Sequence, residues 1–153
     1  MTTIPPVLGI GSRWGTRVAT RRRRRSKAPV VLIVEDDIDV RVLAESIIGD
    51  GGYQTLSAAS GREALALLEQ GAAVALLLTD INLEPGPDGI ELARRAIEAR
   101  PGLPVIYTTG GGQTDGMDAL LVEGAIFLQK PYTRDQLLSA LKQQISGSHQ
   151  TNS

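Results

Sequence analysis

The chain has 153 residues, with hydrophobic and charged fractions of 42% and 22%, which suits one globular domain with a full core. It has no cysteine and a single histidine, His149, which excludes disulfides and cysteine metal sites and argues against a Ser-His-Asp triad. Any bound metal must therefore have oxygen ligands, which favours Mg²⁺, Mn²⁺ or Ca²⁺. The longest apolar run, residues 72–78, is far shorter than the roughly 18 residues of a membrane span.

Charge divides the chain into two parts. The first 28 residues carry 8 basic residues and no acid, whereas the other 125 carry 8 basic and 17 acidic residues, a formal charge of −9. We expect residues 1–28 to be a disordered extension, because they hold too little apolar surface to order themselves. The basic run Arg21–Arg25 suits electrostatic attraction to nucleic acid or anionic lipid. A solvated tail, a start-site error and a targeting segment are alternatives that the residues leave open.

From residue 29 onward, short apolar runs alternate with segments of helical period, which predicts βα units and a parallel sheet. In the first helical segment, the apolar residues that recur with this period are Val40, Leu43, Ala44 and Ile47. We predict strands at residues 30–34, 53–59, 76–80, 105–108 and 125–129. We predict helices near residues 37–48, 61–70, 88–100, 115–122 and 133–146. One α/β domain then occupies residues 29–146, and residues 147–153 form a polar tail.

Polar side chains end four of the predicted strands. Because the carboxyl ends of parallel strands lie at one edge of a sheet, we expect these side chains to meet there. Carboxylates gathered in one place repel each other unless a cation lies among them, and Mg²⁺ accepts one or two carboxylates together with water and phosphate oxygens. An added lysine and hydroxyl complete the equipment for phosphoryl transfer to a carboxylate. The residues are Glu35, Asp36, Asp80, Thr109 and Lys130.

Four stretches carry a resemblance to a known family: residues 31–37 (VLIVEDD), residues 80–83 (DINL) with Asp88-Gly89, residues 104–109 (PVIYTT) and residues 130–132 (KPY). Together they resemble the receiver domain of two-component response regulators, over about residues 29–145. The resemblance implies a flavodoxin-like, doubly wound (βα)5 three-layer sandwich with a parallel sheet of strand order 2-1-3-4-5.

The resemblance also implies a role for each residue at the sheet edge. Asp80 accepts a phosphoryl group from a phosphohistidine, and Lys130 contacts the phosphoryl oxygens. Mg²⁺, or Mn²⁺ in its place, is bound by Asp36, Glu35, Asp80 and the backbone carbonyl of Asn82. Thr109 moves to hydrogen-bond the phosphoryl group, and Phe127 rotates inward as the switch aromatic.

Three local departures from the family pattern concern the loops. The loop after Asp80 is one residue longer than the commonest form, and residues 124–127 are one residue shorter than usual. Gly110 follows the switch threonine where alanine is usual, and it begins a run of three glycines. These departures bear on the geometry of the switch more than on phosphorylation.

The resemblance implies a single-domain response regulator in the cytoplasm, a phosphoacceptor and not an enzyme acting on other substrates. Its partners are a sensor histidine kinase or a phosphotransfer protein, and an unidentified downstream protein. One alternative is a Mg²⁺-dependent aspartyl-phosphatase of the haloacid dehalogenase type, although that class uses an acid two residues after its nucleophile, where this chain has Asn82. Another is a nucleic-acid-binding protein, but the acidic body disfavours any contact beyond a non-specific one through Arg21–Arg25.

Overall fold

A computed structural model describes residues 28–111 and 116–151 of the chain. The predicted basic extension, Ala28 apart, lies outside the described residues, as does the end of the predicted tail. Five parallel strands form one sheet of order β2-β1-β3-β4-β5, which confirms the predicted fold class. The elements are β1 (Val30–Val34), α2 (Ile38–Asp50), β2 (Gln54–Ala58), α3 (Gly61–Glu69), β3 (Leu76–Asp80), α4 (Gly89–Ala99), β4 (Val105–Thr109), the 3₁₀ helix η1 (Met117–Ala119), β5 (Ile126–Gln129) and α5 (Arg134–Thr151).

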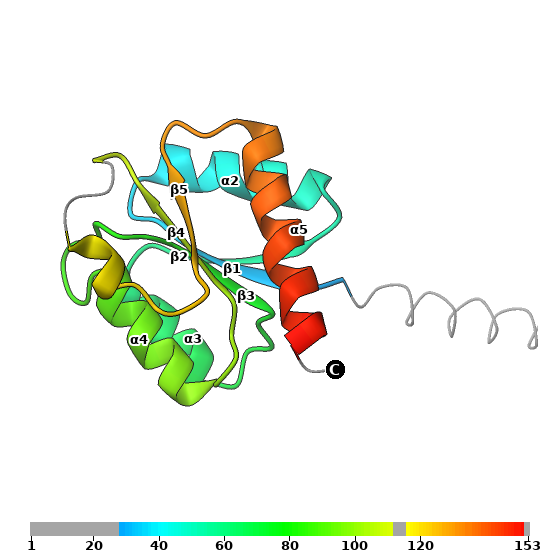
Figure 1. Ribbon diagram of the computed structural model, residues 1–153. Coiled ribbons are helices and arrows are strands. Elements are labelled where there is room, and N and C mark those ends of the chain that lie inside the picture. Colours follow the sequence, from blue (N-terminus) through cyan, green and yellow to red (C-terminus); the bar gives the residue numbers. More distant parts are fainter. Residues whose placement is uncertain (1–27, 112–115, 152–153) are drawn as a thin grey trace, which may run out of the picture.

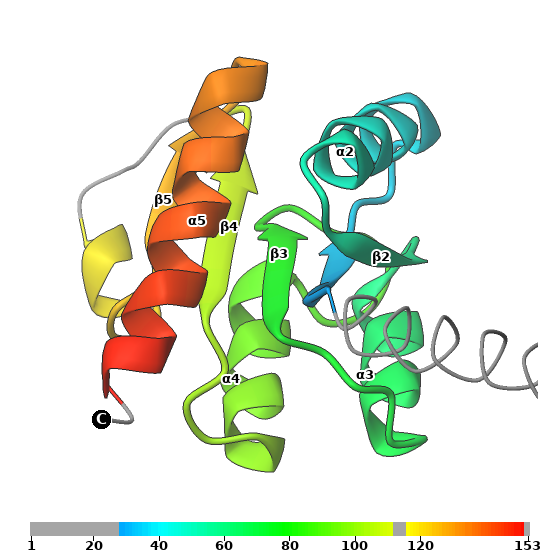
Figure 2. The same ribbon diagram turned by 90° about the vertical axis from the view of Figure 1, so that its right-hand side faces the viewer.

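The sheet lies between two helical layers, with α2 and α5 on one face and α3 and α4 on the other (Figures 1 and 2). Alternate residues of β1 serve the two layers, because successive side chains of a strand point to opposite faces. Val31 and Ile33 pack with α2 and α5, while Leu32 and Val34 pack with α3 and α4. Every residue of β3 and β4 is buried, as expected for central strands covered on both faces.

Side chains cap the N-termini of α2, α3, α4 and α5. Asp37 accepts from the backbone N–H groups of Asp39 and Val40 and so starts α2. Ser60 and Asp88 cap α3 and α4 in the same way. At α5, Thr133 and Gln136 exchange side-chain to backbone hydrogen bonds of 3.1 and 2.8 Å, a complete capping box.

The prediction of a helix at residues 115–122, in the crossover between β4 and β5, is wrong. The described part of this crossover contains only the three-residue η1. Gly116 precedes η1 with a φ of 84°, and no side chain caps its N-terminus. A helix nucleus is costly to form, and a glycine-rich segment without a cap does not offset that cost. Residues 112–115, with the last glycine of the predicted loop, lie outside the described residues.

Two other helical details differ from the sequence prediction. Leu43, expected to face the core, is 59% exposed, and Ala44, Ile47 and Ile48 form the buried stripe of α2 instead. The last helix was predicted to end near residue 146, yet α5 continues to Thr151. A single glycine, Gly147, costs a helix only about 1 kcal/mol relative to alanine, which a long helix tolerates. In the described ranges, no helix combines the length and the apolar character needed to cross a membrane.

Tyr107 of β4 ties the crossover to the sheet. Its side chain is fully buried, and its hydroxyl accepts a hydrogen bond of 3.1 Å from the backbone N–H of Val122. Burial raises the pKa of the Tyr107 phenol above its ordinary value, so the folded state holds its proton more tightly than the unfolded state does. The resulting stability is complete below the unfolded pKa of about 10 and is lost as the pH rises toward the folded pKa.

Tyr107→Phe is therefore expected to lower the free energy of unfolding by about 1 kcal/mol near neutral pH, because the Val122 N–H loses its partner. The same variant is expected to lose less stability than the wild type above pH ~10, because one buried phenol no longer titrates. Urea unfolding at both pH values measures both effects. Tyr53→Phe is the matched control, because Tyr53 is a half-buried tyrosine that packs in the core on the α2 and α5 side of the sheet. An equal loss of stability at high pH in Tyr107→Phe and the wild type would contradict the assignment.

Candidate functional site

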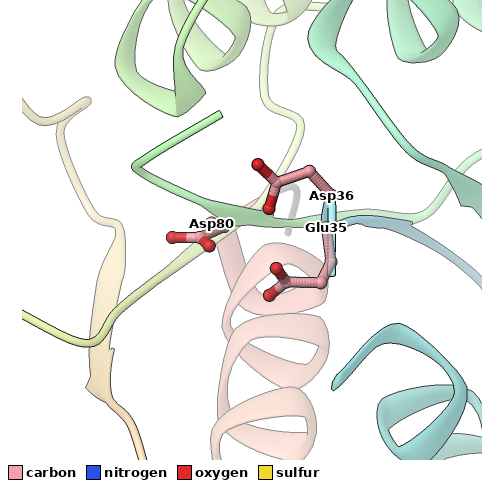
Figure 3. Close-up of side chains that lie close together, drawn as sticks. All are labelled: Glu35, Asp36 and Asp80. Carbon is pink, nitrogen blue, oxygen red and sulfur yellow. The ribbon is translucent and has the colours of Figure 1, made fainter. Parts of the chain in front are cut away.

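Three carboxylates meet where β1 and β3 end, side by side at the carboxyl edge of the sheet (Figure 3). Glu35 and Asp36 follow β1 directly, and Asp80 is the last residue of β3. One ligand oxygen from each of the three lies within 4.8 Å of the others. The strand order reverses between β1 and β3, and such a switch point is where open α/β sheets bind their ligands.

Glu35 is 5% exposed and is held at both its side chain and its backbone. Its Oε1 accepts from Lys130 Nζ at 2.6 Å, and its Oε2 accepts from the Asp37 backbone N–H at 3.2 Å. Its backbone carbonyl accepts from Arg41 Nη1 at 2.7 Å. Burial raises the pKa of the Glu35 carboxyl and outweighs the hydrogen bonds from Lys130 and Asp37, so the charged form is costly at this position.

Asp80 has a partner on each carboxylate oxygen. Oδ1 accepts from the Asn82 backbone N–H at 3.1 Å, and Oδ2 accepts from Lys130 Nζ at 3.0 Å. Its backbone carbonyl accepts from the Thr79 hydroxyl at 2.9 Å. The first residue of α4, Gly89, packs against this carbonyl so closely that a Cβ would lie 2.0 Å from the oxygen. Only glycine therefore allows α4 to start here, which fixes the strand end that carries Asp80.

Lys130 joins Glu35 and Asp80 into one charged group. Its position at the end of β5 is set by the hydrogen bond from its backbone N–H to the Thr109 carbonyl, 2.8 Å long. Burial acts to lower the pKa of the Lys130 ammonium, but hydrogen bonds and charge attraction from Glu35 and Asp80 outweigh it, and the net pKa is raised. The ammonium is therefore charged at neutral pH and balances part of the negative charge.

The carboxylates fit a hard divalent cation. All the candidate ligand atoms are oxygens, Glu35 and Asp80 are buried, and Asp36 is exposed to solvent. This mixture suits Mg²⁺, which usually keeps several waters and takes one or two carboxylates from the protein. Within the described residues, a single lysine balances three carboxylates here, so a cation would relieve the remaining repulsion.

Of the other predicted residues, Thr109 lies at the same edge and Phe127 lies within β5, two residues before its end. Thr109, the last residue of β4, is 2% exposed, and Asn82 connects it to Asp80. Phe127 is half-buried on β5, packs against the core shared with α3 and α4, and pairs across the sheet with Tyr107.

Two contacts of this edge were missed by sequence reasoning. The first is the bond from Arg41 to the Glu35 carbonyl, for which the sequence carries no signal. The second is the bond from the Asn82 side chain to Thr109. The place of Asn82 at the end of β3 was a usable signal for the second, because it brings the amide to the edge where β4 ends.

This arrangement is chemically equipped for a phosphoryl group. A buried carboxylate at the switch point offers a nucleophilic oxygen, a lysine supplies a fixed positive charge, and neighbouring acids can hold a hard cation. Fold and site together define an α/β domain suited to carry a phosphoryl group at its carboxyl edge. Residues 31–142 match the pattern of the response regulator receiver domain, and the chain belongs to that family.

Individual relatives agree with this assignment. The chain is 34% identical over 118 residues to the C4-dicarboxylate transport transcriptional regulatory protein DctD of Rhizobium meliloti (strain 1021), covering 76% of this chain and 25% of that protein. It is 33% identical over 113 residues to sporulation initiation phosphotransferase F of Bacillus subtilis (strain 168), covering 73% and 90%. A crystal structure of a response regulator receiver protein from Sinorhizobium medicae WSM419 has a TM-score of 0.75 at 31% identity, covering 80% and 98%.

Family membership establishes the coarse function. Receiver domains are phosphoacceptors in two-component signalling, bind Mg²⁺ through acidic residues, and interact with histidine kinases or phosphotransfer proteins. The chain spans only a quarter of DctD, so it corresponds to one domain of that regulator.

Proposed function

We propose that Asp80 accepts a phosphoryl group from a phosphohistidine, in a reaction that depends on Mg²⁺ held by Glu35, Asp36, Asp80 and the backbone carbonyl of Asn82. The observation that carries this proposal is the position of Asp80. It lies buried at the switch point, bonded to Lys130 and within ligand distance of two other acids. A carboxylate needed only as a helix cap or a turn residue requires none of these neighbours.

In the proposed step, an oxygen of the Asp80 carboxylate forms a bond to phosphorus while the phosphorus–nitrogen bond of the donor breaks. The donor imidazole keeps the electron pair, and the product is an acyl phosphate on Asp80. The cation would supply charge neutralisation for the phosphoryl oxygens. Lys130 adds a second positive charge from β5, and it exchanges its bond to Asp80 for a bond to the phosphoryl group.

We propose that the new charge then switches a protein-binding face. The Thr109 hydroxyl, at the end of the neighbouring strand, donates to a phosphoryl oxygen, and Phe127 follows inward on β5. The adjacency of β4 and β5 supports this coupling, because Thr109 and Gln129 are paired across the two strands. The output would be contact with a downstream protein or onward phosphoryl transfer.

The comparison with sporulation initiation phosphotransferase F supports a role for this chain in phosphoryl relay, since the match covers 90% of that protein. Within the proposal, the donor is a sensor histidine kinase or a phosphotransfer protein. We further propose that the chain acts as a single-domain regulator and that it works in the cytoplasm.

Neither alternative function gains support. Asn82 has no acidic group with which to act as the general acid of an aspartyl-phosphatase, and family membership favours the receiver function. Nucleic-acid binding through Arg21–Arg25 concerns residues outside the described ranges, and it stays a prediction.

Incubation with acetyl phosphate and Mg²⁺, followed by intact mass measurement, tests the proposed function. We expect one added phosphoryl group per chain, and no addition when a chelator is present from the start. Labelled transfer from a phosphorylated histidine kinase is the second arm, because some acceptors discriminate against small donors. Absence of the adduct in both arms would overturn the proposal, and an adduct formed equally well in chelator would overturn its metal requirement.

A further inference from the structure

The Thr109 hydroxyl accepts two hydrogen bonds in the unphosphorylated protein. One comes from the Asn82 side-chain amide, with 3.2 Å between Nδ2 and Oγ1, and the other from the Gly111 backbone N–H, also at 3.2 Å. A hydroxyl oxygen has two lone pairs, so both are used. Thr109 is 2% exposed, and these two donors therefore define where its hydroxyl lies.

Asn82 contacts both ends of the proposed switch. Its backbone N–H donates to Asp80 Oδ1 at 3.1 Å, and its side chain donates to Thr109. The residue itself is exposed, so its amide reaches inward from the surface to a buried hydroxyl. Phosphorylation of Asp80 would therefore alter the hydrogen bond that the Asn82 backbone makes to it. The Asn82 side chain is in turn bonded to the Thr109 hydroxyl, which moves in the proposed switch.

We propose that the Asn82 side chain is a positioning residue that holds Thr109 in its unphosphorylated position and so opposes switching. This inference deepens the proposed function and rests on it for its biological meaning. In the proposed switch the Thr109 hydroxyl moves toward a phosphoryl oxygen on Asp80, and this movement takes it out of the geometry in which Asn82 Nδ2 and the Gly111 N–H donate to it. Part of the free energy of phosphoryl binding is spent on breaking the Asn82 contact, because a ligand shifts an equilibrium only by its differential affinity for the two states.

The first test uses the unphosphorylated protein and needs no ligand. Three-bond couplings to the Thr109 methyl group, measured by NMR, report the χ1 rotamer populations of this side chain. We expect one dominant rotamer in the wild type and an added second rotamer in Asn82→Ala, where only Gly111 still holds the hydroxyl. Identical couplings in the two proteins would overturn the proposal. A merely structural role of Asn82 in the loop after β3 does not change the Thr109 rotamer.

The second test measures the affinity of Mg²⁺-loaded protein for beryllofluoride, a stable mimic of a phosphoryl group. Asn82→Ala is expected to bind it about fivefold more tightly than the wild type, the effect of one neutral hydrogen bond that no longer needs breaking. Thr109→Val removes the hydroxyl with little change of shape, and in this background Asn82→Ala is expected to have no effect. A double-mutant cycle of the four proteins isolates this coupling.

The beryllofluoride affinities decide whether Asn82 acts through Thr109. Unchanged or weaker binding by Asn82→Ala, or a gain that persists with Thr109→Val, would show that Asn82 does not act through Thr109. A wild type that binds no beryllofluoride would count against the proposed function, while the rotamer measurement still decides whether Asn82 positions Thr109.

Discussion

Asp80→Asn is expected to abolish phosphorylation by acetyl phosphate and by a histidine kinase while leaving the fold intact. The amide has nearly the shape of the carboxylate but lacks the nucleophilic oxygen, so no acyl phosphate forms. In the wild type, Lys130 Nζ and the Asn82 N–H each donate to a different carboxylate oxygen of Asp80. The asparagine side chain has only one oxygen, so one of these two donors loses its acceptor. The loss of that bond is partly offset by weaker repulsion toward Glu35, so we expect the free energy of unfolding to change by no more than about 1 kcal/mol.

Intact mass spectrometry and urea unfolding measure these two expectations on the same preparation. Asp37→Asn is the matched control, because it changes an exposed acid beside the site and asparagine caps a helix as well as aspartate does. This control should be phosphorylated like the wild type. Release of the label by hydroxylamine distinguishes an acyl phosphate from a hydroxyl phosphate. Labelling of Asp80→Asn at the wild-type level, releasable by hydroxylamine, would place the acceptor on another carboxylate.

The sheet was predictable because each strand carries its own signal. The β-branched run before Glu35 and the apolar run before Asp80 are buried on both faces, so their apolar composition has no competing explanation. Caps such as Ser60 and Thr133 mark helix starts by local hydrogen bonds, and these need no tertiary information. The strand order came from resemblance to a family and not from these local signals.

The crossover after β4 could not be predicted in the same way. Its apolar residues recur with helical spacing, yet over the described residues 116–125 packing against the sheet and the bond from Val122 to Tyr107 leave only the 3₁₀ turn η1. Tertiary contacts override a weak helical preference of this kind. The exposure of Leu43 has the same origin, because the docking of α2 on the sheet decides which of its apolar stripes is buried.

The members of the site were predictable and their contacts were not. Strand ends place Glu35, Asp80 and Lys130 at one edge, and elementary topology brings them together. Whether Lys130 bonds one acid or two, and whether Asn82 reaches Thr109, depends on side-chain rotamers and on loops whose path the sequence does not reveal. The roles of these residues in phosphorylation stay predictions until the variants are measured.

Lys130→Met is expected to destabilise the metal-free protein strongly. The methionine keeps the apolar stem but removes the ammonium, which bonds Glu35 at 2.6 Å and Asp80 at 3.0 Å while only 20% of the lysine side chain is exposed. Two carboxylates, whose side chains are 6% and 8% exposed, then face each other without the ammonium that bonds both. Removing one partner of such a buried pair costs about 3 kcal/mol. Urea unfolding in the presence of a chelator measures this loss.

Mg²⁺ is expected to restore much of that stability, and to stabilise Lys130→Met more than the wild type. The ion replaces the missing positive charge, and in the variant it no longer competes with the lysine for the same oxygens. Arg134→Met is the matched control, because the ion pair of Arg134 with Asp50 is exposed and its loss should cost less than about 1 kcal/mol with or without metal. If Mg²⁺ leaves the unfolding midpoint of Lys130→Met unchanged, the three carboxylates do not bind the ion, and the metal requirement proposed for Asp80 loses its physical basis.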